Sequence, residues 1–566
     1  FIMSRILMQK ASYLILLLLL LNHSSALIPL ANSPSWTSID NDYATGAGLA
    51  DINNDCFIDF CTANGNDMAI NKQAIYFNHN GSLETNASWR SADSGYFGHL
   101  YLGDINNDGW IDLAVSYLGF GISNQGRIRI YRNDSSGMAT TPFWQSANQF
   151  NSFDVCFGDI DLDGDLDLAV AAGDAYNNIR MPAQIYKNND GVLEPIAFWS
   201  ARDSTPSDAI RFADLNRDGY LDLIVGGYRK LSVYYNQNGA YPQTANQVIA
   251  ERGWILRMAP ADFNNDGWID LAIATNGQLS GDSSRIKVFK NNYGQLDSVA
   301  SFVMLKNRRY CSCVAWADAN NDGYLDLAAG GWWESLVVFE NRNGVMDTQP
   351  SWSYYNSSLV SEAIVWGDVR NYHIEPRADT LISDGMRKLY YLKKMPIQSI
   401  GSVKVANQII GLSNYCYDLV AGWIVIDTTL NNNDTIIVSY QYSKYPDLAV
   451  TNWTQSAGNY LFYNTTTPAI TSNQAVNAKN KLFSITPNPF SGRIKFQFNT
   501  KNNFNKIKIK IYDSAGKLIN SFSPDITDDY FIWDGKNHFG HDVSTGVYLC
   551  EISYNDQIII AKIIKI

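Results

Sequence analysis

The sequence predicts an all-β fold, a seven- or eight-bladed β-propeller with eight blades favoured, followed by a small Ig-like β-sandwich. Three observations support this prediction. A short acidic loop recurs six times, with 48 to 56 residues between successive copies, and such periods are typical of propellers and solenoids. Each copy lies between apolar runs that suit buried strands. The last segment, residues 482–566, alternates apolar and polar residues like the strands of a sandwich.

The clearest loop runs from Asp104 to Asp112, with oxygen-bearing side chains at positions 1, 3, 5 and 9 and glycine at position 6. Calcium takes six to eight oxygen ligands, and alternate side chains on a tightly wound loop can converge on one ion. The glycine permits a positive φ, so the chain can curl without a Cβ clash. Position 7 should contribute its backbone carbonyl. The pattern therefore predicts up to six Ca²⁺ ions, each held by one loop.

The predicted ligands are Asp51, Asn53, Asp55, Phe57, Asp59, Asp104, Asn106, Asp108, Trp110, Asp112, Asp159, Asp161, Asp163, Asp165, Asp167, Asp214, Asn216, Asp218, Tyr220, Asp222, Asp262, Asn264, Asp266, Trp268, Asp270, Asp318, Asn320, Asp322, Tyr324 and Asp326. One such loop alone could be an ordinary turn, because aspartate, asparagine and glycine are common turn residues. Six copies in register favour ion binding. Cys56 replaces the glycine of the first copy, and a non-glycine residue in the left-handed region costs about 1–2 kcal/mol.

One repeat illustrates the expected unit. Strands are predicted over residues 153–157, 168–171, 184–188 and within 193–199, joined by glycine- and asparagine-rich turns. Four short antiparallel strands make a propeller blade, and a solenoid is the alternative. A tryptophan recurs just before each new unit, which favours packing between neighbouring blades over a sugar-binding stripe. These tryptophans are Trp36, Trp89, Trp144, Trp199 and Trp352.

Two further loops are degenerate. In the first, after Asp368, Arg370 and Tyr372 take ligand positions, so calcium is not expected there. The second begins at Asp427 and closes, after a long insert, at Asp447. Counting both gives eight units, and seven if one is only an insertion. A strand within 33–37 should pair with the last strand of the ring, which would remove exposed sheet edges.

The first residues of the chain indicate the cellular location of the protein. Residues 1–26 combine Arg5 and Lys10 with an apolar core and small residues, which predicts a secretory signal peptide, with a membrane anchor as the alternative. Residues 466–481 are predicted to be a linker.

The seven cysteines fit no zinc spacing, and Cys311 and Cys313, on alternate strand positions, should face one side. Six calcium ions would offset the formal net charge of −12, and no basic stripe indicates a nucleic-acid partner.

Two family resemblances rest on these residues. Residues 33–465 resemble an FG-GAP/VCBS repeat propeller, as in the integrin α-subunit head and many bacterial surface proteins, on the strength of the six loops. Residues 482–566, with the run from Pro487 to Phe490 and the late Gly546-Val-Tyr-Leu motif, resemble the C-terminal sorting domain of the type IX secretion system of Bacteroidota-like bacteria. The resemblance implies export by that machinery and a secreted or cell-surface protein without a transmembrane anchor in the mature chain. An ordinary Ig-like binding module is the alternative.

Function is expected on the face opposite the acidic loops. Loops between second and third strands emerge there and carry aromatic residues suited to ligand contact. The candidates are Phe120, Tyr176, Tyr228, Trp332, Trp333 and Trp453. The sequence predicts a noncatalytic binding or adhesion module for glycan or protein ligands, with a calcium-dependent polysaccharide lyase or hydrolase as the alternative. No catalytic residue is predicted, and His79, His99 and His373 are interpreted as surface or packing residues.

Overall fold

The computed structural model describes residues 28–281, 284–308, 310–454, 457–466, 483–486, 490–498, 507–513, 517–523, 530–554 and 557–565. The predicted signal peptide and almost all of the predicted linker lie outside these residues. The described chain consists of strands and turns, with two short 3-10 helices, η1 (Ile122–Asn124) and η2 (Leu412–Asn414). The all-β prediction is therefore confirmed.

The first strand of each unit is its innermost strand, and it precedes the acidic loop. These strands are β2 (Ala44–Ala50), β6 (Phe97–Gly103), β10 (Ser152–Gly158), β17 (Ser207–Ala213), β19 (Gln247–Ala261), β25 (Cys311–Ala317) and β31 (Ile364–Gly367). The second strand begins at the ninth loop residue. The second strands are β3 (Asp59–Asn64), β7 (Asp112–Tyr117), β11 (Asp167–Asp174), β18 (Asp222–Tyr234), β20 (Asp270–Asn276), β26 (Asp326–Gly331) and β39 (Asp447–Val450).

Most of the outer strands are shorter. The third strands are β4 (Ala74–Tyr76), β8 (Arg129–Tyr131), β13 (Gln184–Tyr186), β21 (Ser284–Phe289), β27 (Leu336–Phe339) and β40 (Tyr460–Phe462). The fourth strands are β5 (Trp89–Arg90), β9 (Trp144–Gln145), β16 (Trp199–Ser200), β24 (Phe302–Arg308), β30 (Trp352–Tyr354) and β1 (Trp36–Thr37). The fourth and fifth units share one six-stranded sheet, because β19 pairs with β18 near its start and with β20 over its second half. The short strand β12 (Ile179–Arg180) pairs with the end of β11. Three separate hairpins follow third strands: β14 (Asn188–Asn189) with β15 (Val192–Leu193), β22 (Asn291–Asn292) with β23 (Gln295–Leu296), and β28 (Asn341–Arg342) with β29 (Val345–Met346).

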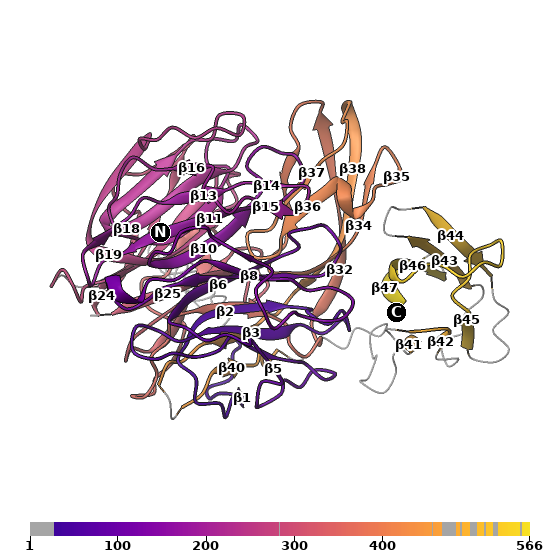
Figure 1. The fold of residues 1–566 in the computed structure, drawn as a ribbon, viewed down its shortest axis with the longest axis horizontal. Coiled ribbons are helices and arrows are strands. Elements are labelled where there is room, and N and C mark those ends of the chain that lie inside the picture. The colour runs from indigo at the N-terminus through magenta and orange to yellow at the C-terminus, as the bar shows by residue number, and fades with distance from the viewer. Residues whose placement is uncertain are drawn as a thin grey trace, which may run out of the picture.

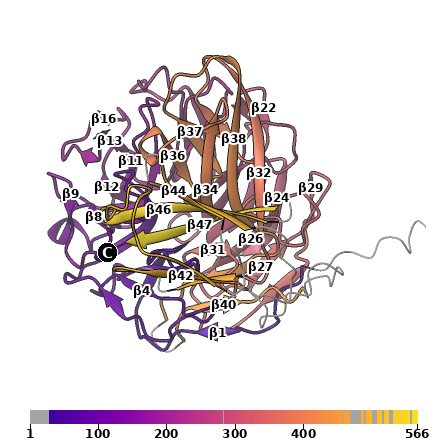
Figure 2. The ribbon, with the colours of Figure 1, turned by 90° about the vertical axis from the view of Figure 1, so that its right-hand side faces the viewer.

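The units are arranged in a ring, seen from the side in Figure 1 and along its axis in Figure 2, with the inner strands packed against each other. Neighbouring inner strands contact each other in chain order from β2 to β31, and β31 contacts β2 again. The strand near the N-terminus completes the last unit, since β1 pairs antiparallel with β40 through Trp36 and Leu461. The predicted pairing of an early strand with the last strand of the ring is confirmed.

A repeated asparagine ties each unit to the one before it. Asn188 follows the third strand of its unit, and its Nδ2 donates to the Ile105 carbonyl of the preceding loop at 2.8 Å. Its backbone N–H donates to Asp167 Oδ1 of its own unit at 2.7 Å. The same inter-unit bond is made by six other residues, and the bond from Asn78 to the Val369 carbonyl joins the first unit to the last. The other donors are Asn133, Asn236, Asn291, Asn341 and Asn464.

These buried bonds lead to a stability prediction. Asn188→Ala should lower the free energy of unfolding by about 1–3 kcal/mol, because the buried Ile105 carbonyl would lose its partner. Chemical denaturation measures the change. Asn189→Ala is the matched control, since Asn189 is exposed and its side chain bonds to the exposed Glu194. Equal effects of the two substitutions would contradict the role of this bond.

The structure corrects the expected eighth unit. The inner strand β31 pairs directly with β39, so Asp368 and Asp447 are the first and ninth residues of one interrupted loop. The segment between them, including Asp427, forms an insertion with two sheets of its own, and we call residues 374–443 the insertion. Its strands are β32 (Ile374–Asp384), β38 (Asn432–Ser443), β34 (Ile397–Val405) and β35 (Gln408–Ile409), and β33 (Leu389–Tyr391), β37 (Trp423–Ile426) and β36 (Tyr415–Asp418). The strand pairing therefore fits the seven-unit alternative among the described residues.

The insertion and the C-terminal domain lie on the same side of the ring (Figures 1 and 2). The C-terminal domain is the expected sandwich of two antiparallel sheets around one apolar core, which includes Phe496, Ile509 and Trp533. One sheet contains β41 (Phe483–Thr486), β42 (Ile494–Phe498) and β45 (Tyr530–Trp533). The other contains β44 (Leu518–Phe522), β43 (Ile507–Asp513), β46 (Gly546–Tyr554) and β47 (Gln557–Lys565).

Two expectations about side-chain packing have different outcomes. The repeated tryptophans pack between units as expected. Trp89 Nε1, in the first unit, donates to the Met138 carbonyl of the second unit. Trp199 Nε1, in the third unit, donates to the Tyr241 carbonyl of the fourth unit. The expectation that Cys311 and Cys313 face one side is wrong. A register shift separates them in β25, and they belong to different apolar clusters. A bulge adds one residue to a strand and so reverses the faces of the residues after it.

Candidate functional site

The six acidic loops share one backbone conformation. Positions 4 and 6 have positive φ in every copy, as a tight curl around a common point requires. Position 4 is asparagine, leucine or arginine, with φ between 54° and 62°: Asn54, Asn107, Leu162, Arg217, Asn265 and Asn321. At position 6 of the first loop, Cys56 adopts φ 75°, so this residue occupies the strained conformation that glycine takes in the other five.

The first and ninth aspartates fix each loop by accepting backbone hydrogen bonds. In the second loop, Asp104 Oδ1 accepts from Asp108 N at 3.0 Å and Asp104 Oδ2 from Gly109 N at 2.7 Å. Asp112, which is fully buried, accepts from Ile105 N and from Asn133 N. Each loop is thus wound around carboxylates that remain close together and largely shielded from water.

Several oxygens in these loops have no partner among the described residues. One buried acceptor in each of loops two to five makes no hydrogen bond: Asn106 Oδ1, Asp161 Oδ1, Asp214 Oδ1 and Asp270 Oδ2. In the third loop, one oxygen each of Asp159, Asp161 and Asp167 lie within 4.8 Å of one another. A buried acceptor without a partner costs free energy, and oxygen clusters of this kind suit a hard cation.

The pKa values of the loop carboxyl groups are consistent with a cation site. Burial, together with the Asp55 carboxylate, raises the pKa of Asp51 to about 7. Burial raises the pKa of Asp222 to about 8, with a further contribution from Asp214. Negative charge is therefore crowded inside the loops, and a bound cation would offset it. Some ammonium groups already approach: Lys187 pairs with Asp161, and Lys394 Nζ lies 3.1 Å from Asp318 Oδ2.

The insertion and the C-terminal domain cover parts of this face. Tyr391 OH accepts the Asp214 backbone N–H at 3.0 Å, and Lys562 Nζ donates to the Gly109 carbonyl at 2.5 Å. Trp110, at position 7 of the second loop, is buried against Val547 and Ile564 of the C-terminal domain. These two segments therefore occupy part of the acidic-loop face, whereas the predicted ligand contacts belong to the opposite face of the ring.

On that opposite face, the structure brings five of the six predicted aromatic residues into one group. Trp332 and Trp453 lie with ring centroids 5.5 Å apart, and Tyr228 packs beside them. Tyr176 contacts Trp254, whose ring centroid lies 6.5 Å from that of Trp332. Trp333, the fifth predicted residue, joins the group through Tyr310, which contacts both Trp333 and Trp332. Phe120 lies apart, against Tyr96.

Trp332 and Trp333, two adjacent ligand-contact candidates, differ in exposure. Trp332 is 4% exposed, and its indole N–H donates to the Glu362 carboxyl group. Trp333 is 52% exposed. Trp332 forms a β-bridge with Val360, whereas Trp333 adopts φ 57° in the turn that follows, so the chain changes direction between the two rings. Among the predicted aromatics, Phe120, Tyr176 and Trp333 are thus the ones that present exposed rings.

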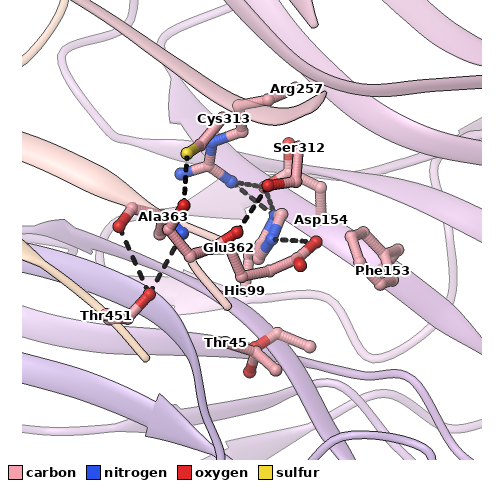
Figure 3. A network of polar contacts seen from close by, with 12 residues as sticks. Thr45, His99, Phe153, Asp154, Arg257, Ser312, Cys313, Glu362, Ala363 and Thr451 are labelled. Carbon is pink, nitrogen blue, oxygen red and sulfur yellow. Dashed lines mark hydrogen bonds and ion pairs between the residues drawn. The ribbon is translucent and has the colours of Figure 1, made fainter. Parts of the chain in front are cut away.

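A buried polar network at the centre of the ring was not predicted (Figure 3). Asp154 Oδ2 accepts from Arg211 Nη1 at 2.6 Å, and Asp154 Oδ1 accepts from Arg257 Nη1 at 3.0 Å. His99 Nδ1 lies 2.5 Å from Arg257 Nη1, and its Nε2 lies 4.0 Å from Glu362 Oε1. These residues come from the inner strands β6, β10, β17 and β19 and from the residue pair before β31.

The charges in this network are set by burial and by the two guanidinium groups. Burial alone would raise the pKa of Asp154, but Arg211 and Arg257 offset it and hold that pKa well below its ordinary value. Burial and the Arg257 charge lower the pKa of His99 to about 4. Burial also raises the pKa of Glu362 to about 8. At neutral pH the histidine is uncharged. Its Nδ1 lies between the Arg257 guanidinium group and Asp154 Oδ1, which is 3.3 Å away.

A bulge in the inner strands explains how these polar residues reach the axis. The pairing with the second strand shifts between Ser152 and Asp154 and between Ile255 and Arg257, and comparable shifts occur in β2, β6, β17 and β25. A bulge re-aims the side chain beside it. The signal available in the sequence was the presence of His99, Asp154 and Arg257 five residues before the first loop aspartate of their units.

The buried histidine leads to a pH prediction. The folded-state pKa of about 4 lies below the ordinary value of 6.5, so its contribution to stability is complete above pH 6.5 and is lost as the pH falls toward 4. The loss should reach about 3 kcal/mol. Denaturation of wild type and His99→Gln at pH 7 and pH 4.5 measures this difference. His79→Gln, which alters an exposed histidine, is the control. A His99→Gln variant with the pH dependence of wild type would contradict the prediction.

Fold and site together define an all-β, propeller-type protein with repeated acidic loops and an added C-terminal sandwich. Comparison with known families agrees: FG-GAP-like repeats match residues 35–115, 163–225 and 214–273. The secretion system C-terminal sorting domain matches residues 484–566. The chain therefore carries FG-GAP-like repeats and a type IX sorting domain, which marks a secreted or cell-surface protein of the Bacteroidota type. No helix in the described part of the chain has the length and apolarity needed to span a membrane.

Individual proteins show more limited similarity. A phosphatidylinositol-glycan-specific phospholipase D of Rattus norvegicus is 31% identical over 144 residues, which cover 20% of this chain and 17% of that protein. The chain thus spans about a sixth of the length of that relative. Three solved structures are also similar. A BBS1N–ARL6DN complex has 10% identity, TM-score 0.43 and coverage of 78% of this chain and 98% of the other. An Agrocybe aegerita lectin that recognises non-reducing terminal N-acetylglucosamine has 18% identity and TM-score 0.33, and the match covers 55% of this chain and 80% of the lectin chain. Saccharomyces cerevisiae Sqt1 has 10% identity and TM-score 0.37, and the match covers 73% of this chain and 99% of that chain.

Proposed function

We propose that this protein is a secreted or cell-surface calcium-binding propeller that acts as a noncatalytic binding or adhesion module for an extracellular glycan or protein. The calcium would be held by the six loops, with the side chains at positions 1, 3, 5 and 9 and the carbonyl at position 7 as donors. The observation that carries the proposal is the set of buried loop oxygens without partners, exemplified by Asp161 Oδ1 and Asp214 Oδ1.

Bound calcium would supply charge neutralisation and a fixed loop geometry. Each loop joins an inner strand to its second strand, and some loops contact the loop of a neighbouring unit. Asn107 Nδ2, for example, donates to the Gly164 carbonyl of the next loop at 2.9 Å, and Asn265 Nδ2 does the same to Gly323 at 3.0 Å. Rigid loops on one face would hold the inner strands in place and so fix the aromatic group on the other face.

The ligand surface would be the face with the grouped aromatics. Exposed rings there include Phe120, Tyr176 and Trp333, and flat aromatic faces with adjacent acids suit sugar rings and protein side chains. Asp208 and Glu362, bonded to the indoles of Trp254 and Trp332, hold the buried rings beneath the surface in fixed orientations.

The alternative, a calcium-dependent polysaccharide-degrading enzyme, is favoured by one feature, the approach of His99 Nε2 to Glu362 Oε1. However, His99 is 0% and Glu362 2% exposed. A polymer could not reach these groups in this conformation, which supports the noncatalytic proposal.

A glycan array and a panel of extracellular proteins, screened in calcium and again with chelator, test the proposal. Wild type should be retained on a ligand in calcium, and Trp333→Ala should weaken that binding at least tenfold, because an exposed aromatic anchor is removed. Tyr293→Ala is the control, since this residue is 87% exposed but lies against Trp268 on the acidic-loop face.

Release of cleaved product from a polysaccharide would favour the enzyme instead. Equal loss of binding in the Trp333 and Tyr293 variants would contradict the choice of face, and unchanged binding after calcium removal would contradict the role of the loops.

A further inference from the structure

The axis of the ring contains a cavity that neither the acidic loops nor the aromatic face explains. It has a volume of about 120 Å³, and residues of all seven inner strands line it. A single water needs roughly 10–15 Å³ by a comparable measure, so the cavity can hold a small organic molecule. Two segments of the insertion, residues 395–397 and 418–421, complete its wall.

Most of the lining is apolar, with two guanidinium groups at one end. Rings of Phe157, Phe212, Trp316 and Trp366 contribute to the wall. Arg211 and Arg257 line the same cavity, and they and Asp418 are its charged lining residues. This combination gives an apolar body to the cavity and a strongly hydrogen-bonding end.

The two arginines have donors to spare. Within the described residues, their hydrogen bonds to Asp154, to His99 and to the Ile210 carbonyl all use Nη1. The Nε and Nη2 atoms of both arginines make no hydrogen bond to the described residues, and none of these atoms is among the fully enclosed polar atoms without a partner. They are thus accessible from the cavity. A planar guanidinium group presents such N–H pairs in the geometry that a carboxylate accepts.

The insertion supplies a competing anion. Asp418 accepts from Tyr101 OH at 2.7 Å through Oδ2 and from the backbone N–H groups of Val420 and Ala421 through Oδ1. Asp154 compensates one of the two arginine charges. Asp418 lies on the Arg211 side of the cavity, since its partner Tyr101 packs beneath the Arg211 guanidinium group, 5.6 Å from the ring centroid. Asp418 therefore serves as an internal counter-ion at the cavity wall.

We propose that this axial cavity is a binding site for a small organic carboxylate, whose charged group bonds to Arg211 and Arg257 and whose apolar body packs against the aromatic lining. Segments of the insertion cover part of the cavity, and its volume suits a free small molecule. Asp418 competes with the ligand for the arginines and so weakens binding.

The probe is benzoate, whose planar carboxylate and single ring match the two ends of the cavity. Calorimetric titration of the folded full-length chain, in a buffer of low anion content, measures its affinity. Fluorescence of Trp316 and Trp366 provides a second readout. Benzoate should bind, whereas benzamide, which has the same shape without the charge, should bind at least tenfold more weakly.

Variants test the two charged groups in opposite directions. Arg257→Gln should weaken benzoate binding at least tenfold, and Asp418→Asn should strengthen it, an effect that a purely structural role for Asp418 would not produce. Arg202→Gln, at an exposed arginine, should leave the affinity unchanged. Ala315→Leu keeps both arginines and fills part of the cavity, so it should also weaken binding, even where Arg257→Gln fails to fold.

Absence of benzoate binding by both wild type and Asp418→Asn would overturn the proposal. Binding that is unchanged in Arg257→Gln or Ala315→Leu would overturn it as well, because the benzoate would then lie elsewhere.

Discussion

Asp154→Asn should destabilise the ring by about 3–5 kcal/mol, the usual cost of removing one partner from a buried ion pair. The carboxylate is fully buried and lies between Arg211 and Arg257. Asparagine keeps the shape of the side chain but removes the carboxylate that bonds to both guanidinium groups, so two like charges at the axis lose their shared partner. Urea denaturation followed by tryptophan fluorescence should show a transition at much lower denaturant concentration.

Two further variants define that result. Asp174→Asn is the matched control, because this buried aspartate bonds to Asn177 and pairs with no arginine among the described residues. The double substitution Asp154→Asn with Arg211→Gln should cost less than the sum of the single changes, since it removes one of the uncompensated charges. Additive effects would contradict a direct ionic coupling at the axis.

Removal of calcium should lower the melting temperature of the propeller by roughly ten degrees or more. An ion that binds only the folded state adds about 2.7 kcal/mol per site at a concentration of a hundred times its Kd. Several loops would lose this contribution together when a chelator is added. Scanning calorimetry with and without chelator measures the shift.

Specificity for calcium provides the control. Excess calcium should restore the transition, whereas magnesium should restore little of it, because Mg²⁺ demands a smaller octahedral shell and dehydrates reluctantly. A melting curve that is identical with and without chelator would contradict a stabilising role for calcium.

Local pattern was sufficient to predict the repeating unit. The loop spacing, together with runs such as Leu168–Ala171, located the inner and second strands, because both features lie within a few residues of each other. The closing pair of β1 and β40 was also predictable, since an unpaired outer strand at one chain end needs a partner at the other. These elements depend on short-range chemistry or on ring closure.

Long-range pairing explains what the pattern missed. Asp427 resembled the start of a further loop, and only the pairing of β31 with β39 shows that it belongs to an insertion. His99, Asp154 and Arg257 each stand alone in an apolar strand, and their meeting depends on bulges and on the closure of the ring. Trp332 and Trp333 are adjacent in the sequence, yet the fold buries one and exposes the other.

The most direct test of the account is the number of calcium ions bound to each chain, measured by elemental analysis after equilibrium dialysis in millimolar calcium. Wild type should bind several ions, up to six. Asp161→Ala should bind one fewer, because the Asp161 carboxylate converges with those of Asp159 and Asp167, and the exposed Asp190→Ala should lose none. A wild-type chain that retains no calcium above background would contradict the account.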